Sequence, residues 1–288
     1  MIAFPCAKIN LGLNIVSRRQ DGYHNLQTVF WPIQLCDALE IKTMHEAFPS
    51  AAPCDLKVTG NDVACNEEDN LVTRAYRMLA ADHELPRVHA HLYKNIPSQA
   101  GLGGGSSDAS YMIRLLDNRF RLNLGNSVME SYAARLGADC PFFISAEPAY
   151  AEGIGEVLSP VNVHKSMLDS TIVVVKPAVA ISTREAFSMI TPMCPERCCR
   201  DIVALPVTEW RQAGLSNDFE KSAFSLYPEL ADIKRTLYDM GAAYAQMSGS
   251  GSSIFGLFMG DTDADRISHV FGDCRTFVLS GDQMPKSM

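Results

Sequence analysis

The sequence predicts an α/β protein with two domains. At 288 residues the chain is long enough to bury a large core, and a loop-like stretch at 159–170 would separate residues 1–158 from residues 159–288. Strand-like and helical segments are mixed in both halves. A glycine-rich run at 101–105 stands directly before an amphipathic helix, an arrangement that is typical of phosphate-binding proteins.

The N-terminal segment alternates strictly between polar and apolar residues. One side carries Lys8, Asn10, Gly12 and Asn14, and the other carries Ile9, Leu11, Leu13 and Ile15. This period of two predicts a half-buried strand, whose polar side is either solvated or part of a site. The Asp21-Gly22 pair that follows predicts a hairpin turn.

The other elements follow from periodicity, turn residues and caps. Strands are expected near 27–35, 38–44, 55–59, 88–94 and 171–175, with a hairpin at 149–158. Helices are expected near 69–82, 127–136 and 228–240, the last two closed by Gly137 and Gly241. The segment 248–253, Ser-Gly-Ser-Gly-Ser-Ser, lies between two apolar strands and is either a tight hairpin or a second wall of an active site.

The glycine-rich run predicts a phosphate-binding loop. Its residues are Ala100, Gly101, Leu102, Gly103, Gly104, Gly105, Ser106 and Ser107. Glycines let the backbone approach an anion closely, and the first N–H groups of the next helix are unpaired donors at the positive end of its dipole. We expect Ser106 or Ser107 to be the N-cap of that helix, with Asp108 in its first turn.

Two other phosphate motifs fit less well. A P-loop needs Gly-Lys-Ser/Thr at the end of the run, but Gly105 is followed by Ser106-Ser107. A dinucleotide fingerprint would need a third glycine at position 106, and the run lies too far along the chain to open a first βαβ unit. A dinucleotide-binding oxidoreductase therefore stays only as an alternative.

Composition indicates a soluble globular protein. The net charge of -8 argues against a nucleic-acid surface, so backbone donors, a few lysines and Mg²⁺ would have to hold phosphate. No apolar run is long enough to span a membrane, and the N-terminus lacks a signal-peptide pattern.

Nine cysteines without regular spacing predict reduced thiols and a cytoplasmic location. The cluster Cys194, Cys198 and Cys199 lacks zinc-site spacing and is expected to be a loop with free thiols, whose role the sequence leaves open, as it does the oligomeric state.

Three ordered segments resemble the motifs of the GHMP small-molecule kinases. They are Pro5-Cys6-Ala7-Lys8-Ile9-Asn10-Leu11, the loop 101–107, and 248–251. The segments 21–26 (Asp-Gly-Tyr-His-Asn-Leu), 137–143 (Gly-Ala-Asp-Cys-Pro-Phe-Phe) and 151–156 (Ala-Glu-Gly-Ile-Gly-Glu) resemble one branch of that family. This branch phosphorylates a cytidine diphosphate derivative of methylerythritol on the non-mevalonate route to isoprenoids.

The resemblance implies a two-domain α+β fold, an N-terminal ATP-binding domain and a C-terminal kinase domain, with the active site in the cleft between them. It also implies that ATP, with Mg²⁺ whose ligands stay unknown, phosphorylates a hydroxyl of the methylerythritol moiety. Asp139 would be the general base, and Lys8 would hold Asp139 ionised and stabilise charge at the attacking oxygen. From local sequence alone, Asp139 could equally be a structural cap after Gly137.

Further site residues follow from the resemblance. Residues 100–107 would hold the ATP phosphates, and the nucleoside would be bordered by Asn70, Leu71 and Lys94. The acceptor would contact Asn10, and its cytosine would lie between Tyr23 and Phe187, with His24 at the base edge. A further wall would consist of Ser248, Gly249, Ser250 and Gly251.

Tyr23 by position alone could also fill a core. Two further alternatives stay open within the family: a kinase acting on mevalonate or homoserine, and a catalytically silent sugar-sensing protein. The Tyr23-His24 pair disfavours the first, and the presence of both Lys8 and Asp139 disfavours the second.

Overall fold

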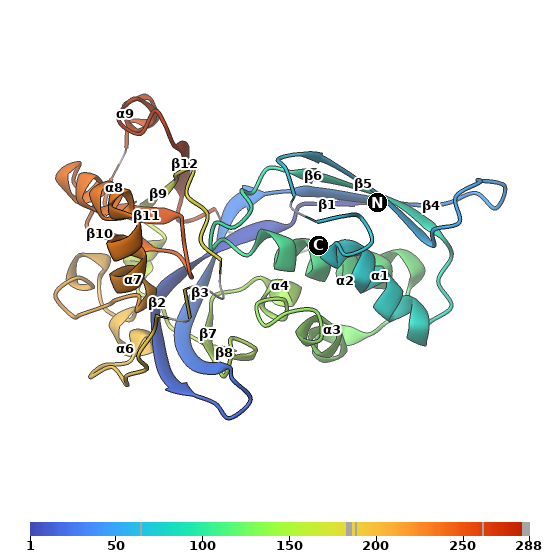
Figure 1. The fold of residues 1–288 in the computed structure, drawn as a ribbon, viewed down its shortest axis with the longest axis horizontal. Coiled ribbons are helices and arrows are strands. Elements are labelled where there is room, and N and C mark those ends of the chain that lie inside the picture. Colours follow the sequence, from blue (N-terminus) through green and yellow to red (C-terminus); the bar gives the residue numbers. More distant parts are fainter. Residues whose placement is uncertain (64, 183–185, 188, 261, 284–288) are drawn as a thin grey trace.

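The structure is a computed structural model and describes residues 1–63, 65–182, 186–187, 189–260 and 262–283. Within these residues the strands form three four-stranded sheets; in Figure 1 the first lies on the right and the other two on the left, with the third above the second. The mixture of helices and strands confirms the predicted α+β class. No helix in the described part of the chain combines the length and the apolar character needed to cross a bilayer.

The first sheet has the strand order β1-β4-β6-β5, and its pairs are antiparallel except for the parallel pair β5-β6. Its strands are β1 (Ile2–Ala3), β4 (Ala38–Thr43), β5 (Cys54–Gly60) and β6 (Val88–Lys94). The helices α1 (Leu71–Asp82) and α2 (Gly104–Phe120) pack together on one face of this sheet (Figure 1). Asn70 caps α1, because its side-chain oxygen accepts the Val72 N–H at 2.9 Å.

The second sheet is antiparallel, with the strand order β2-β3-β7-β8. Its strands are β2 (Cys6–Arg18), β3 (His24–Cys36), β7 (Ala149–Glu152) and β8 (Val157–Pro160). The predicted turn at Asp21-Gly22 joins β2 to β3, and Gly22 has a φ of +89°, which a glycine adopts without strain. Between β3 and β7 the chain forms α3 (Gly125–Ala134) and α4 (Phe142–Ser145) among other elements.

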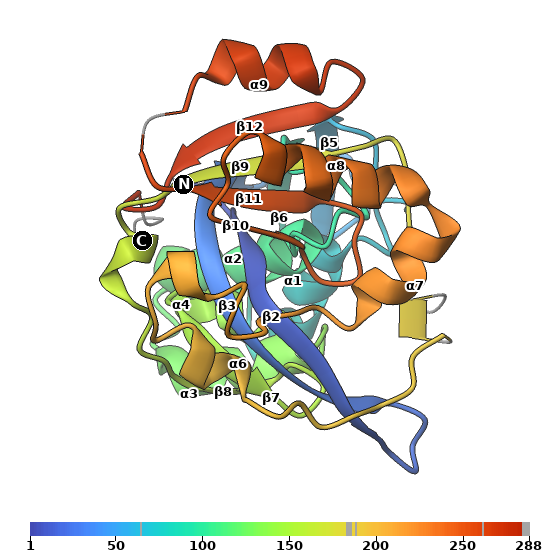
Figure 2. The same ribbon diagram turned by 90° about the vertical axis from the view of Figure 1, so that its left-hand side faces the viewer.

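The third sheet is also antiparallel, with the order β10-β11-β9-β12. Its strands are β9 (Thr171–Lys176), β10 (Tyr244–Met247), β11 (Ile254–Phe258) and β12 (Arg275–Ser280). The helix α8 (Pro228–Asp239) packs against β10 and β11, as Figure 2 shows. The other helical segments of this half are η1 (Lys165–Met167), α6 (Cys199–Ile202), η2 (Val207–Glu209), α7 (Phe219–Leu226) and α9 (Ala264–Val270).

The strand β2 differs from its prediction because both of its faces are buried. Its polar residues Lys8, Asn10 and Asn14 are 1% to 6% exposed. The C-terminal half covers them: Gly12 N donates to Gln246 Oε1 at 3.0 Å, and Leu13 N donates to the Ser216 carbonyl at 2.8 Å. The half-buried prediction and its solvated alternative are therefore both wrong, since a period of two cannot reveal a second half of the chain packed on the polar face.

The predicted boundary between residues 158 and 159 falls inside β8, which the structure extends to Pro160. Apart from the last two residues of β8, the first two sheets lie before this boundary, and the third sheet lies after it. The exact boundary stays a prediction, because the two halves also share hydrogen bonds along β2.

Candidate active site

The polar row of β2 faces a pocket between the two halves. Lys8 Nζ donates to Asn10 Oδ1 at 2.6 Å and to the Gly101 carbonyl at 3.1 Å. Asn10 Nδ2 donates in turn to Thr28 Oγ1 on β3 at 2.9 Å. Because these side chains are buried, the hydrogen bonds hold the ammonium group in one place beside the glycine-rich loop.

Asp139 lies next to Lys8, on the turn between α3 and α4. Its Oδ2 is 3.6 Å from Lys8 Nζ, and its side chain is 34% exposed, whereas that of Lys8 is 4% exposed. Burial lowers the pKa of Lys8 from its ordinary value, and the Asp139 carboxylate opposes that shift. The pair thus joins a buried cation to a carboxylate that a bound hydroxyl can reach, so the structure brings together the two residues predicted to be catalytic.

The β7–β8 hairpin shapes the surroundings of Asp139, a role that the sequence did not assign to it. A Cβ atom on Gly155 would lie 3.5 Å from Asp139 Oδ1, so the hairpin backbone is in contact with this carboxylate. Glu156 Oε2 accepts the Ile154 N–H at 2.6 Å and closes the turn, while Ile154 lines the pocket. The Gly-Ile-Gly-Glu pattern was the available signal for this wall.

The glycine-rich loop packs directly against the segment 248–253. A Cβ atom on Gly101 would lie 1.9 Å from the Ser248 carbonyl oxygen, so only glycine fits there. Ser248 Oγ donates to the Gly101 carbonyl at 2.9 Å, and Ser253 N donates to the Ala100 carbonyl at 3.2 Å. The segment joins β10 to β11 and also packs against the glycine-rich loop. It is therefore a hairpin connection and a wall of the pocket at once, so the two predicted alternatives do not exclude each other.

The helix α2 begins earlier than predicted. It starts at Gly104, and its N-cap is Gly103, which has a φ of +73° and no capping side chain. The expected N-cap at Ser106 or Ser107 is therefore wrong, because a left-handed glycine turns the chain into the helix before the serines are reached. As a consequence Gly105 and Ser106 lie in the first turn, where N–H groups have no partner within the helix.

The pocket holds almost all of the residues predicted for the site. Its volume is about 1240 Å³. Those that line it are Lys8, Asn10, Tyr23, His24, Asn70, Leu71, Lys94, residues 100–106, Asp139, Phe187 and residues 249–251. Two predicted residues do not line it: Ser107 and Ser248 are fully buried. Ser248 supports the loop from behind instead.

The aromatic residues of the pocket are arranged differently from the expected pair of Tyr23 and Phe187. His24 stacks on Phe187, with ring centroids 5.1 Å apart and an interplanar angle of 18°, and Phe187 meets Phe219 edge-on. Tyr23 is 61% exposed, so it does not fill a core. Burial and the neighbouring Arg18 lower the pKa of His24.

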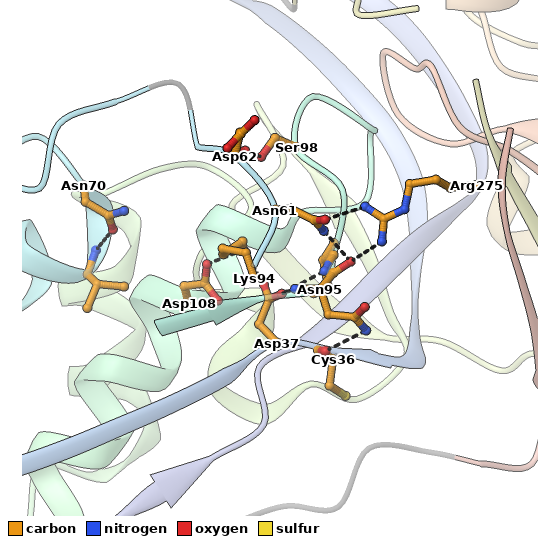
Figure 3. Close-up of polar contacts among 12 residues, drawn as sticks. Cys36, Asp37, Asn61, Asp62, Asn70, Lys94, Asn95, Ser98, Asp108 and Arg275 are labelled. Carbon is orange, nitrogen blue, oxygen red and sulfur yellow. Dashed lines mark hydrogen bonds and ion pairs between the residues drawn. The ribbon is translucent and has the colours of Figure 1, made fainter. Parts of the chain in front are cut away.

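The predicted nucleoside residues lie at the opposite end of the pocket. Leu71 is partly buried at the start of α1, next to Gly105. Lys94 is buried, and its Nζ is bonded to the carboxylates of Asp37 and Asp108, as Figure 3 shows. Its ammonium group is thus engaged within the protein. The sequence analysis missed Asp37, although an acidic residue at a junction between two predicted strands was a possible signal.

An arginine of the C-terminal half contacts the segment that precedes the glycine-rich loop. Arg275 Nη1 donates to Asn61 Oδ1 at 2.7 Å, and its Nη2 donates to the Asn95 carbonyl at 3.4 Å (Figure 3). Asn61 Nδ2 donates to the same carbonyl at 2.8 Å. These bonds join β12 to the segment that enters the glycine-rich loop.

The residues around the loop do not form a metal cage. Among the described residues, no group of three His, Cys, Asp or Glu side chains could hold a metal ion. Asp139 and Asp108 are each paired with a lysine. Mg²⁺ in kinases is bound largely through substrate phosphates, with one or two carboxylates. Mg²⁺ therefore stays a prediction, and we assign no protein ligand to it.

Gly103→Ala is expected to raise the KM for ATP roughly tenfold. The new Cβ would lie 2.8 Å from the Phe143 ring, and an alanine at a φ of +73° adds backbone strain of about 1–3 kcal/mol. The matched control is Gly125→Ala, at a φ of +70° but with nothing within 4 Å. Steady-state kinetics with varied ATP should show the increase in the first variant and not in the second. An equal KM in both would mean that the loop does not contact ATP.

Two family models match the chain on either side of the predicted boundary. Residues 70–147 match the GHMP kinases N terminal domain, and residues 208–274 match the GHMP kinases C terminal domain. The first match contains the glycine-rich loop and Asp139, and the second contains the segment 248–253.

Relatives and solved structures extend the match over nearly the whole chain. A 4-diphosphocytidyl-2-C-methyl-D-erythritol kinase of Bacteroides fragilis is 52% identical over 90% of this chain and 92% of its own. The enzyme of the same name from Parabacteroides distasonis is 47% identical over 95% and 97%. A crystal structure of 4-(cytidine 5'-diphospho)-2C-methyl-D-erythritol kinase superposes with a TM-score of 0.80 at 30% identity, covering 97% and 98%.

The fold is shared more widely than the sequence. A homoserine kinase from Cytophaga hutchinsonii superposes with a TM-score of 0.69 at only 14% identity, covering 96% of this chain and 94% of its own. That likeness concerns the fold alone, whereas the relatives above are far more similar in sequence. The chain therefore belongs to the GHMP kinases, and within them to the family of the 4-diphosphocytidyl-2-C-methyl-D-erythritol kinases.

Proposed function

We propose that this chain transfers the γ-phosphoryl group of ATP to a hydroxyl of 4-(cytidine 5'-diphospho)-2-C-methyl-D-erythritol, on the non-mevalonate route to isoprenoid precursors. One observation carries the proposal: Asp139 Oδ2 lies 3.6 Å from Lys8 Nζ, and that ammonium group is also bonded to the Gly101 carbonyl of the loop. A base, a cation and a phosphate-binding loop are thus within reach of one transferred group. The names of the relatives supply the acceptor.

In this mechanism Asp139 accepts the proton of the acceptor hydroxyl while the hydroxyl oxygen attacks the γ-phosphorus. The bond from the γ-phosphorus to the oxygen that bridges it to the β-phosphate breaks, and ADP leaves with that oxygen. Lys8 stabilises the charge at the attacking oxygen and forms an ion pair with the Asp139 carboxylate. Phosphoryl transfer depends mainly on such positioning and charge neutralisation, with Mg²⁺ screening the phosphates.

The loop would bind the phosphates of ATP through backbone N–H groups. The first turn of α2 offers unpaired donors and the positive end of the helix dipole, which suits an anion even in a protein of net charge -8. Leu71, Leu92 and Ile96 give this end of the pocket an apolar lining that suits a purine ring. The wall at 249–251 would close the loop from the C-terminal half.

The cytosine would bind between Tyr23 and Phe187. Phe187 is already stacked against a flat ring, that of His24, so its face can accept a heterocycle. We propose that the base takes this place and that His24 then hydrogen-bonds its edge, which requires the His24 ring to turn. Asn10, beside Lys8, would contact the acceptor near its reacting hydroxyl.

Tyr23→Ala should raise the KM for the cytidine diphosphate acceptor about 5- to 150-fold, because stacking on an aromatic side chain is worth roughly 1–3 kcal/mol per base. The KM for ATP should change little. The matched control is Tyr93→Ala, which removes a tyrosine that is 50% exposed on β6 and does not line the pocket. An unchanged acceptor KM in Tyr23→Ala would argue against stacking at this residue.

The acceptor itself is tested by ADP release with Mg·ATP and a substrate panel. The panel contains the cytidine diphosphate compound, methylerythritol phosphate without the cytidine, mevalonate and homoserine. We expect turnover with the first and little with the others. Equal turnover of the truncated compound would refute the cytidine pocket, and preference for mevalonate or homoserine would move the chain to another GHMP kinase activity.

A cytoplasmic location and a small-molecule partner also belong to this proposal. All nine cysteines are unpaired in the structure, an arrangement that suits a reducing compartment, and a net charge of -8 disfavours a nucleic-acid partner. Cys194, Cys198 and Cys199 lie outside the pocket and have no part in the mechanism.

A further inference from the structure

Three buried charged side chains lie directly behind the glycine-rich loop. Lys94 Nζ is 2.6 Å from Asp108 Oδ2 and is also bonded to Asp37 Oδ2. The three side chains are 0% to 5% exposed. Figure 3 shows Lys94 between the two carboxylates. Burying one cation with two anions costs desolvation free energy, and the attraction between the charges offsets it only in part. We therefore look for a role of this cluster other than stabilising the fold.

The cluster is attached to the segment that enters the loop. Asp37 Oδ1 accepts the N–H groups of Asn95 at 2.6 Å and Ile96 at 2.8 Å. Asp37 thus binds three consecutive residues: the side chain of Lys94 and the backbone N–H groups of Asn95 and Ile96. Its own N–H donates to the Pro5 carbonyl at 2.9 Å, so this anchor is fixed to the first sheet and to the segment that precedes β2.

The cluster is also attached to the segment that leaves the loop. Asp108 belongs to α2, five residues after its N-cap Gly103. A Cβ atom on Gly104 would lie 3.4 Å from Lys94 Nζ, so the lysine lies directly beneath the first residue of the helix. The bond between Lys94 and Asp108 therefore ties the entry of the loop to its exit, across residues 97–103.

The charge of the cluster is compatible with phosphate nearby. Asp108 Oδ1 is buried and has no hydrogen-bond partner. Burial raises the pKa of Asp108 to about 8, and Lys94 opposes the shift. Burial thus favours the protonated form of Asp108, which limits the negative charge of the cluster beside the loop.

We propose that Asp37, Lys94 and Asp108 form a clasp that keeps the loop 97–103 closed in its ATP-binding geometry, so that Asp37 and Asp108 are positioning residues for the nucleotide. An ordered loop binds more tightly, because less conformational entropy is lost when ATP arrives. The clasp rests on the proposed function only in taking ATP as the ligand of the loop. It does not depend on the identity of the acceptor.

The decisive variant is Asp108→Leu. It removes the exit side of the clasp with a side chain of similar size, while Lys94 stays paired with Asp37, so no unpaired charge is left buried. We expect the Kd of Mg·ATP, measured by calorimetry without acceptor, to rise about 10- to 50-fold. Hydrogen exchange of the amides in 97–103 should become faster in the nucleotide-free protein. Asp108→Asn, which can still accept a bond from Lys94, should recover most of the affinity.

The matched control is Lys234→Met, which breaks the Lys234–Glu220 ion pair of 2.7 Å in the C-terminal half. That variant should leave the Kd of Mg·ATP and the loop exchange unchanged, even if its melting temperature falls. If Asp108→Leu does not fold well enough to measure, Asp37→Asn carries the same test, with faster loop exchange and a higher Kd of Mg·ATP expected.

Two results would overturn the clasp. One is a Kd for Mg·ATP in Asp108→Leu within twofold of the unmodified protein, with unchanged loop exchange. The other is a lower melting temperature together with losses of ATP affinity and acceptor affinity by similar factors. That result would show that the cluster only stabilises the fold. Weakened ATP binding in Asp108→Leu, together with no phosphorylation of the cytidine diphosphate compound by the unmodified protein, would instead refute the acceptor and leave the clasp standing.

Discussion

Asp139→Asn is expected to lower kcat by about 10²–10⁴, which is the usual contribution of a positioned general base. The amide keeps the size and shape of the carboxylate but cannot accept the proton of the attacking hydroxyl. Because Asp139 is 34% exposed, the change should preserve the fold but lower the melting temperature, since the buried Lys8 ammonium group loses its charged partner. The Kd of Mg·ATP should stay nearly the same, since the loop is unchanged.

The measurement is a single-turnover rate with ATP in excess, together with a melting curve. A matched control is Asp55→Asn on β5, whose side chain shares a hydrogen bond of 2.9 Å with His89 away from the pocket. That control should retain full activity. A near-normal kcat in a folded Asp139→Asn protein would return this residue to the role of a structural cap between α3 and α4.

Lys8→Met is expected to lower kcat by about 10²–10³, as for the loss of a preorganised charge-stabilising donor. Lys8 Nζ contacts Asp139, Asn10 and Gly101 at once, so no neighbouring group can replace it. The loss should appear in kcat more than in the KM for ATP, which distinguishes it from Gly103→Ala. Identical kinetic signatures in the two variants would contradict the separate roles of the lysine and the loop.

The pH dependence gives a second test of Lys8. Burial lowers its pKa, so the ammonium group loses its proton at a lower pH than an ordinary lysine does. We expect kcat to be highest below this pKa, where Lys8 is protonated. It should fall as the pH rises toward the alkaline range, because the charge at the attacking oxygen is then no longer balanced. The control is Lys57→Met on the exposed side of β5, which should keep the profile of the unmodified protein.

Local sequence patterns predicted most of the secondary structure because the forces that act there are local. The alternation at 8–15 predicted β2, and the apolar spacing at 69–82 predicted α1, since side-chain period follows from backbone geometry alone. The predicted strand at 88–94 and the helix at 228–240 agree with β6 and with α8 to within a residue. The glycine-rich run predicted an anion-binding loop for the same reason.

The same local rules failed where a residue contacts a distant part of the chain. They placed the N-cap at Ser106 or Ser107, whereas the N-cap is Gly103, which lies against Phe143 from another element. They left the polar face of β2 half-exposed, although the C-terminal half covers it. They also gave no indication that Lys94, which the resemblance places beside the nucleoside, is paired with Asp37 and Asp108.

By itself, then, the sequence determined most of the elements, the place of the glycine-rich loop before a helix and, through its resemblance to a kinase family, the candidate site residues. Only the tertiary structure decided that Lys8 lies 3.6 Å from Asp139, that Gly101 touches Ser248, and that His24 rather than Tyr23 stacks on Phe187. Periodicity and capping act over a few residues, whereas these contacts join residues more than 100 positions apart. Such contacts depend on how whole sheets pack, and no short window of sequence contains that information.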